Sequence, residues 1–293
     1  MIDFIVLLAK ISQVIEVSLN SSLPFTWHGI IFNPVYRKGR IVWYDGQYEN
    51  LHLRLTEYEL RISNSLHKFY KGNNYSDFNY SEIKSAITLI CIRFNLIPKD
   101  VYVKKLEFGF NIIIDKPVKE YIECFHSFKH RDFDKMRHKT IEYGRKCFLN
   151  EYAIKCYDKK SQVSINDKIP LTENLMRIEM CYSNPRKLPD IYTLQDLLDY
   201  NSIKRLFNLL IGVIKQTVFI AHYDFSNTSS QERELFYASL HHEFIKTEQR
   251  LNKERTKEIK RRIKLLSERI CNNGVKRHLL KSLSDKYIDL LLS

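Results

Sequence analysis

The sequence lacks several features that would assign it to common functional classes. Its six cysteines never occur as a CxxC pair, which argues against a thiolate zinc site and against a disulfide framework. No apolar run approaches the ~20 residues that a membrane-spanning helix needs. The apolar segment at residues 2–9 is short, contains Asp3 and lacks a basic head, so it predicts a buried strand rather than a signal peptide. We therefore expect a cytoplasmic protein with reduced cysteines and no membrane partner.

Acidic residues are scarce relative to basic ones. The 293 residues include 47 Lys and Arg against 34 Asp and Glu, which gives a formal net charge of +13. Such a field favours polyanionic partners, either nucleic acid or an acidic membrane surface. The 18 tyrosines and 17 phenylalanines suit the stacking of single-stranded bases. An AT-rich coding bias would enrich Lys, Ile, Asn and Tyr together, but it does not explain the excess of cations over anions.

The order of the predicted elements indicates an α+β protein. Short runs rich in β-branched and aromatic residues, separated by turn signals, predict strands through the first half of the chain, and the second half has helical periodicity. No internal repeat or low-complexity segment occurs. We place a domain boundary at the Ser-Asn-Pro-Arg-Lys-Leu-Pro segment, residues 183–189. Residues 1–185 would form an antiparallel-sheet catalytic domain, and residues 186–293 a basic helical domain for DNA binding or oligomerisation.

Several local segments carry further predictions. Residues 12–19 favour a short helix, and residues 63–78 favour a polar, basic loop that either contacts DNA or is a plain surface loop. Ser81 would cap a helix over residues 82–95, and Pro117 would open another helix that extends to about residue 128. Residues 126–138 have the composition of an irregular basic linker. Residues 231–267 predict one long helix whose basic later half is either a solvated face or a nucleic-acid contact.

The chain is organised around three segments with period-2 alternation, residues 103–114, 152–160 and 175–182. Each would be a strand with one apolar face and one face that carries ionisable groups. The polar faces hold Lys105, Glu107, Gly109 and Asn111 in the first segment, Ala153, Lys155, Tyr157 and Lys159 in the second, and Leu175, Arg177, Glu179 and Cys181 in the third. If the strands are neighbours, they pool a tyrosine, two carboxylates and several cations. That set suits cleavage of a phosphodiester.

The chemistry of these residues supports the same interpretation. A tyrosine phenol has a pKa near ~10, so it must lose its proton to a base or be helped by cations. Lys155 and Lys159 would flank Tyr157, lower its pKa and grip the phosphate. Carboxylate oxygens favour Mg²⁺ or Mn²⁺. The structural alternatives are a half-buried strand tyrosine and a cross-strand ion pair between Arg177 and Glu179.

Three spaced motifs resemble rolling-circle replication initiators of small staphylococcal plasmids. VKKLEFGFN at residues 103–111 resembles the "(R)LDxAFD" strand of that family. YGR at 143–145 with IKCYDKK at 154–160 resembles its "YxG…R…IYNKxxE" segment, and RIEM at 177–180 resembles its "RxExEL" strand. The upstream SLHKFY and GNN, within residues 65–74, are similar to phage and plasmid replication proteins grouped with gene II and gene X of filamentous phages. The resemblance covers roughly residues 50–185.

This resemblance implies an enzyme that nicks one strand of a plasmid or phage origin. Tyr157 would be the nucleophile and form a 5′-phosphotyrosine link with a free 3′-OH, and Tyr143 and Tyr152 are its rivals. Glu107, Asn111 and Glu179 match the family's metal positions, although Asn111 and Glu107 stand where the family usually has Asp. The chain has no His-hydrophobic-His triplet, so a carboxylate-based site fits better than a histidine-paired one.

The implied partners are origin DNA, single-stranded or as an extruded hairpin, a host helicase and polymerase, and a second copy of the chain. Ten residues would contact the DNA: Lys105, Arg145, Lys160, Arg177, His67, Lys68, Lys257, Lys260, Arg261 and Arg262. The alternative from another class is an inert DNA-binding replication or repressor protein on the same scaffold, which the Asn111 departure favours. A third is an RNA-binding protein, but it has no need for a tyrosine with two carboxylates.

Overall fold

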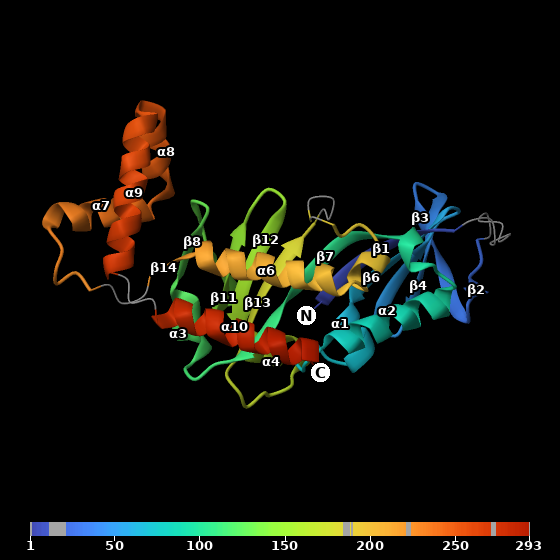
Figure 1. Cartoon of the computed structure of the whole chain (residues 1–293). Coiled ribbons are helices and arrows are strands. Elements are labelled where there is room, and N and C mark those ends of the chain that lie inside the picture. The colour runs from blue at the N-terminus through green and yellow to red at the C-terminus, as the bar shows by residue number, and fades with distance from the viewer. Residues whose placement is uncertain are drawn as a thin grey trace.

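The computed structural model describes residues 2–11, 22–183, 188, 190–220, 224–270 and 274–292. One long sheet forms the body of the molecule, with helices packed along one face and a helical arm projecting from one end (Figure 1). The expected α+β class, an antiparallel sheet with a helical C-terminal region, is confirmed. None of the helices in the described ranges is long and apolar enough to cross a membrane.

The main sheet contains 11 strands in the order β10-β11-β12-β13-β7-β1-β6-β5-β4-β3-β2, and β14-β8-β9 form a small second sheet. All their described pairings are antiparallel. The strands are β1 (Ile2–Lys10), β2 (Phe25–Trp27), β3 (Ile30–Arg37), β4 (Arg40–Tyr48), β5 (Leu51–Leu55), β6 (Glu59–Ser65), β7 (Val101–Ile113), β8 (Phe125–Phe128), β9 (Arg131–Asp132), β10 (Asp134–His138), β11 (Ile141–Phe148), β12 (Tyr152–Asp158), β13 (Leu175–Tyr182) and β14 (Val218–Phe219).

Several helices, among them α1, α2, α4, α6 and α7, begin where a side chain accepts from a free backbone N–H group. Asn79, not Ser81, caps the second helix, and it forms a capping box with Glu82. The helices are α1 (Leu66–Lys71), α2 (Tyr80–Phe94), the 3₁₀ turn η1 (Pro98–Asp100), α3 (Val118–Glu123), α4 (Lys159–Asp167), α5 (Leu194–Leu197), α6 (Tyr200–Gln216), α7 (Ser230–Leu240), α8 (His242–Leu251), α9 (Lys253–Ile270) and α10 (Gly274–Leu292).

The apolar face of the sheet is covered by helices from the C-terminal part of the chain. Phe110 of β7 packs edge-on against Phe207 of α6 and Tyr287 of α10. One buried cluster joins Leu106 with Leu283. The division predicted at residue 185 therefore does not separate two hydrophobic cores, because α6 and α10 complete the core of the sheet.

Four further local predictions were wrong, and the helix predicted at residues 12–19 lies outside the described residues. The segment predicted as a loop over residues 63–78 contains the end of β6 and helix α1. Ser65 caps the start of α1, and Gly72 ends it at a φ of 74°. The linker predicted at 126–138 is largely strands β8, β9 and β10, and the helix after Pro117 stops before β8. The long helix predicted at 231–267 is divided into α7, α8 and α9.

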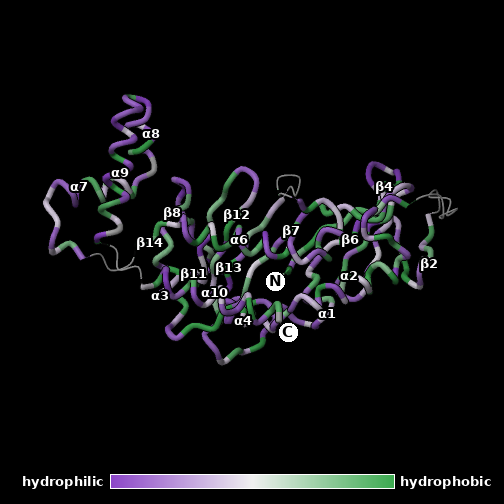
Figure 2. The backbone as a smooth tube through the Cα atoms, in the orientation of Figure 1, coloured by the Kyte–Doolittle hydropathy of each residue, from purple (hydrophilic) through white to green (hydrophobic). Residues whose placement is uncertain are grey.

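Helices α7, α8 and α9 form the arm. They bury a small cluster of their own, Phe236, Leu266 and Ile270, apart from the main core. Figure 2 shows that hydrophilic residues predominate along α8 and α9. The arm is therefore held by few apolar contacts and exposes a largely polar surface.

Candidate active site

The three motif strands are neighbours in the order β12-β13-β7. The register places Lys155 opposite Glu179 and Tyr157 opposite Arg177. On the other side of β13, Glu179 lies opposite Gly109, and Cys181 opposite Glu107. Because alternate residues of a strand share a face, the predicted polar faces merge into one surface, as expected from the sequence.

The two carboxylates are bridged by one ammonium group. Lys155 Nζ lies 2.8 Å from Glu179 Oε1 and 3.2 Å from Glu107 Oε2, and Lys105 Nζ lies 2.6 Å from Glu107 Oε1. Burial raises the pKa of Glu107, but the charges of Lys155 and Lys105 outweigh burial, so this pKa is lowered. Burial lowers the pKa of Lys155, but the carboxylates, Glu179 first, reverse the effect and raise it. Glu107 is therefore ionised and Lys155 protonated at neutral pH.

Tyr157 is the tyrosine of this cluster. Its side chain is buried, with 6% of the residue exposed, and its O–H donates to Glu179 Oε2 at 3.2 Å. Burial raises the pKa of Tyr157 well above its ordinary value, and the Glu179 charge raises it further. The phenol is therefore neutral, with its proton directed at the carboxylate that would accept it.

The two rival tyrosines lie differently. The ring of Tyr143 is 6.3 Å from the ring of Tyr157, edge to face, whereas Tyr152 stacks on Tyr182 at 5.0 Å. Tyr152 lies at the far end of β12, five positions from Tyr157. Tyr143 is thus the nearer rival.

Arg177 connects the cluster to the N-terminal strand. Its guanidinium pairs with Glu179 Oε2 at 3.0 Å and with Asp3 Oδ2 at 3.1 Å, and Nη1 donates to the Asn74 carbonyl at 3.1 Å. Asp3 also accepts from Ser65 and from Asn74. The sequence analysis did not identify Asp3 and Asn74 as residues of the site. The only available signal was an acidic residue inside the apolar residues 2–9.

Gly109 has no side chain because none fits. A Cβ there would lie 2.2 Å from the Ile178 carbonyl oxygen and 2.6 Å from Glu179 Cβ. These separations are well below van der Waals contact. The glycine therefore lets β7 and β13 approach at the level of Glu179.

Lys159 does not flank Tyr157 on the strand, as the sequence predicted. Strand β12 ends at Asp158, whose side chain caps α4, so Lys159 is the first helical residue. It is fully buried, and Nζ donates to Asn74 Oδ1 at 2.9 Å and to Gln162 Oε1 at 2.7 Å. Burial, followed by the charge of Arg177, lowers the pKa of Lys159 to about 7. Its ammonium supports the segment around Asn74.

Asn111 lies apart from the two glutamates. It is opposite Arg177 and four positions from Glu107, or about 13 Å along the strand. Its Nδ2 donates to the carbonyls of Asn74 and Tyr75 at 3.2 and 3.1 Å. Its Oδ1 is buried without a partner among the described residues. The geometry therefore gives Asn111 a role in holding the 74–75 backbone, not in sharing an ion with Glu107.

The donor set can be tested against the expected divalent ion. Oxygens of Glu107 and Glu179 and the Cys181 sulfur lie within 4.8 Å of one another. Two carboxylates fit Mg²⁺ or Mn²⁺. Burial raises the pKa of Cys181, which keeps the thiol protonated and unsuited to a hard cation. Since Lys155 already bridges the two carboxylates, a divalent ion would compete with its ammonium for the same oxygens.

The predicted DNA contacts on the body are mostly paired or buried. Arg145 pairs with Glu142, Lys68 with Asp167, and Lys160 bonds the Thr172 carbonyl. His67 is buried against Phe78, and burial lowers its pKa to about 2. His67 is therefore neutral and structural. On α9, Lys257, Lys260, Arg261 and Arg262 are all exposed.

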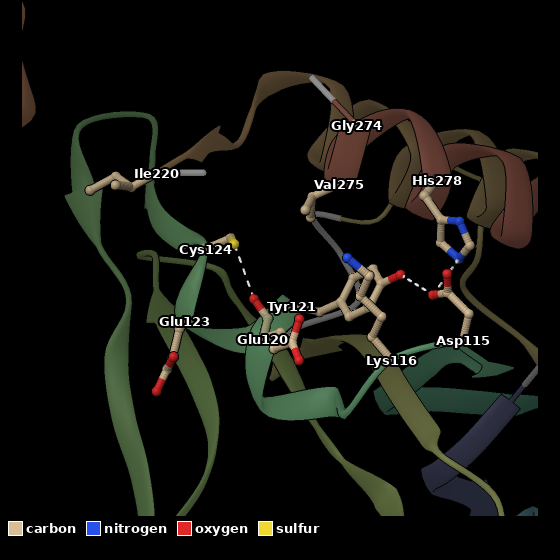
Figure 3. A pocket seen from close by; sticks show the side chains of 10 residues that line it. All are labelled: Asp115, Lys116, Glu120, Tyr121, Glu123, Cys124, Ile220, Gly274, Val275 and His278. Atoms are coloured by element: carbon tan, nitrogen blue, oxygen red, sulfur yellow. Dashed lines mark hydrogen bonds and ion pairs between the residues drawn. The ribbon is translucent and has the colours of Figure 1, made fainter. Parts of the chain in front are cut away.

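A separate hollow of about 490 Å³ lies between α3 and the start of α10 (Figure 3). Tyr121 donates to Asp115 at 2.5 Å, and His278 lies 3.8 Å from the same carboxylate. Its lining contains none of the residues clustered around Tyr157. It is not part of the candidate active site.

No protein-family model matches this chain, and no curated protein matches its sequence. The functional argument therefore rests on the residues and their geometry.

Proposed function

We propose that this protein initiates replication of a plasmid or phage by nicking one strand of its origin. The observation that carries the proposal is the hydrogen bond from Tyr157 to Glu179, inside a cluster that contains a second carboxylate. A nucleophile bonded to its base, with the base oriented by a further group, is the arrangement that covalent catalysis needs. Here Arg177 and Lys155 orient Glu179.

In the proposed reaction, Tyr157 Oη attacks the phosphorus of one phosphodiester, and its proton passes to Glu179. The new O–P bond links the tyrosine to the 5′-phosphate. The bond from phosphorus to the 3′ oxygen breaks, and that oxygen takes a proton from solvent. The products are a 5′-phosphotyrosine and a free 3′-OH, which a host polymerase can extend after a helicase opens the duplex.

Cations around the cluster would stabilise the charge that develops on the phosphoryl oxygens. Lys155 keeps its proton, because the neighbouring carboxylates raise its pKa, and Lys105 lies beside Glu107. A Mg²⁺ or Mn²⁺ ion held by Glu107 and Glu179 would add Lewis-acid polarisation of the phosphate.

The face of the sheet that carries Tyr157 offers a path for single-stranded DNA. Lys105 lies over the Phe4 ring at 4.4 Å, Lys146 over Phe148 at 4.0 Å, and Arg54 over Trp43 at 3.9 Å. The registers place Lys105 and Lys146 on the face of Lys155, opposite the face that α6 and α10 cover. Paired cations and aromatic rings bind phosphates and stack bases without sequence preference.

The inert DNA-binding protein remains a second candidate, and one observation favours it. Tyr157 is buried and its pKa is raised, which is also the condition of a structural tyrosine in an ion network. Catalysis therefore requires that the bound strand or a local opening exposes the phenol.

A strand-cleavage assay tests the function. The protein is incubated with Mn²⁺ and single-stranded DNA from its own replicon, labelled at either end, and the 3′ product is offered to a polymerase. We expect a cut at one position and a 3′ end that the polymerase extends. Salt-sensitive binding without cleavage would favour the inert protein.

A further inference from the structure

A second hollow lies where the arm meets the body. It has a volume of about 600 Å³ and is lined by the ends of β8, β14 and α6 on the body side and by α7, α8 and α9 on the arm side. His126 in β8 bonds the Leu240 carbonyl of α7 at 2.8 Å next to it. We call this hollow the arm cleft.

The lysines of the arm cleft have no acidic residue beside them in its described lining. Its basic lining residues are Lys129, His130, Lys215, Lys260, Lys264 and Lys276, and no Asp or Glu lines it among the described residues. The chain has 34 acidic residues, yet none of them lines the arm cleft among the described residues. The positive potential of the lysines is therefore concentrated there.

Four of these lysines have no ion-pair partner within the described part of the chain: Lys129, Lys215, Lys260 and Lys264. Two other cations of α9 are paired locally, Lys257 with Glu254 and Arg261 with Glu258. Lys260 and Lys264 are four residues apart, so they lie one above the other on one face of the helix. That face is the one turned to the body.

The remaining lining combines uncharged polar residues with an apolar set. It includes Val218 and Phe219 from the body and Phe236, Ile245 and Ile263 from the arm. Val218 is 41% exposed. Exposed lysines together with buried apolar side chains in one lining match a partner that has a charged backbone and flat apolar faces. Single-stranded nucleic acid has this chemistry.

We infer that the arm cleft binds a segment of single-stranded DNA, as a second contact on the strand that the Tyr157 cluster would cut. The identity of the strand rests on the proposed function. A hollow of this volume is the size of a small-ligand pocket, so it admits a nucleotide or two of a single strand and no duplex. Lys215 and Lys264 were not among the DNA contacts predicted from the sequence. Four α9 cations were predicted to contact DNA, and of these only Lys260 lines the arm cleft among the described residues.

Fluorescence anisotropy with a labelled single-stranded oligonucleotide tests the inference over a range of salt concentrations. The cleft variant is Lys260→Ala with Lys264→Ala, and the matched control is Lys257→Ala with Arg261→Ala, which removes equal charge from the same helix outside the cleft. We expect the cleft variant to bind at least about tenfold more weakly. Its slope of log affinity against log salt should fall by about 1.4, because each lysine that no longer neutralises a phosphate lowers the slope by roughly 0.7. The control should change less than about threefold.

Equal weakening in both variants would overturn the inference, because it would reduce the effect to net charge. If the cleft variant proves unstable by thermal unfolding, Lys215→Ala on α6 makes the same test from the body side. Covalent adduct formation is measured on the same samples. If wild type forms no adduct but the cleft variant binds DNA more weakly than the control, nicking is refuted and the binding role of the arm cleft stands. If wild type forms the adduct and the cleft variant binds as well as the control, nicking stands and the role of the arm cleft is refuted.

Discussion

At the scale of single residues, the site depends on Gly109 having no side chain. The Cβ of an alanine there would overlap the Ile178 carbonyl and the backbone of Glu179, so β7 and β13 must separate. We predict that Gly109→Ala lowers the free energy of unfolding by about 1–3 kcal/mol, measured by urea denaturation. Gly212→Ala in α6 is the control, because nothing lies within 4 Å of its Cβ and alanine favours a helix by about 1 kcal/mol. Equal stability of the two variants would contradict the close approach.

Asp3 links stability to pH. Burial raises its pKa, but Arg177, Ser65 and Lys159 together lower it from 3.8 to about 2. A carboxyl with a depressed folded-state pKa stabilises the fold above the unfolded value, and this contribution disappears as pH falls through the folded value. A shift of this size corresponds to roughly 2 kcal/mol.

We therefore predict that the unfolding free energy of wild type falls by about 2 kcal/mol between pH 4 and pH 2 through this group. Asp3→Asn removes that contribution at neutral pH and flattens this part of the profile. Chemical denaturation of both proteins across this range is the measurement. If the unfolding free energies of the two proteins changed in parallel with pH, the ion pair between Asp3 and Arg177 would not contribute to stability.

At the scale of elements, the sequence predicted the three motif strands because alternation is a local signal. The contacts of Tyr157, Lys155 and Glu179 follow once those strands are neighbours, but the order β12-β13-β7 was not predicted. Lys159 was placed wrongly because Asp158 favours a helix cap, which ends the strand one residue earlier than the alternation suggests. Asp3 and Asn74 could not be predicted, since their roles depend on strand β1 and the turn after α1 meeting Arg177, far apart in sequence.

The Lys155 ammonium on β12 pairs with Glu179 on β13 and with Glu107 on β7. We therefore predict that Lys155 competes with a metal ion for these carboxylates. Lys155→Met removes the ammonium from between Glu107 and Glu179, so we expect Mn²⁺ to bind at least about tenfold more tightly than to wild type. Titration followed by electron paramagnetic resonance measures it. Lys146→Met is the control, because Lys146 lies opposite Lys155 on β11 but over Phe148. Unchanged Mn²⁺ affinity in Lys155→Met would show that the glutamates do not form the ion site.

At the scale of the whole molecule, the C-terminal part of the chain divides by packing and not by sequence position. Helices α6 and α10 belong to the main core, whereas Phe236, Leu266 and Ile270 form a cluster within the arm. Ile220 and Gly274 line the same hollow (Figure 3), so the two ends of the arm segment lie close together. The predicted helical domain at 186–293 thus contains both a part of the body and the arm.

We predict that replacing residues 221–273 with a short Gly-Ser linker leaves a body that unfolds cooperatively. Deleting residues 274–292 instead removes Leu279, Leu283, Tyr287 and Leu290 from the core, and we expect that protein to aggregate. Calorimetry and size-exclusion chromatography compare the two. A soluble, cooperative protein without α10 would contradict the shared core.

The central claim is that Tyr157 forms a covalent bond with DNA. Wild type, Tyr157→Phe and Tyr143→Phe are incubated with labelled single-stranded DNA from the protein's replicon and Mn²⁺, and denaturing electrophoresis detects any adduct. We predict an adduct with wild type and with Tyr143→Phe and none with Tyr157→Phe, although all three bind the DNA equally. An adduct that persists in Tyr157→Phe, or no adduct in any of the three, would contradict the claim.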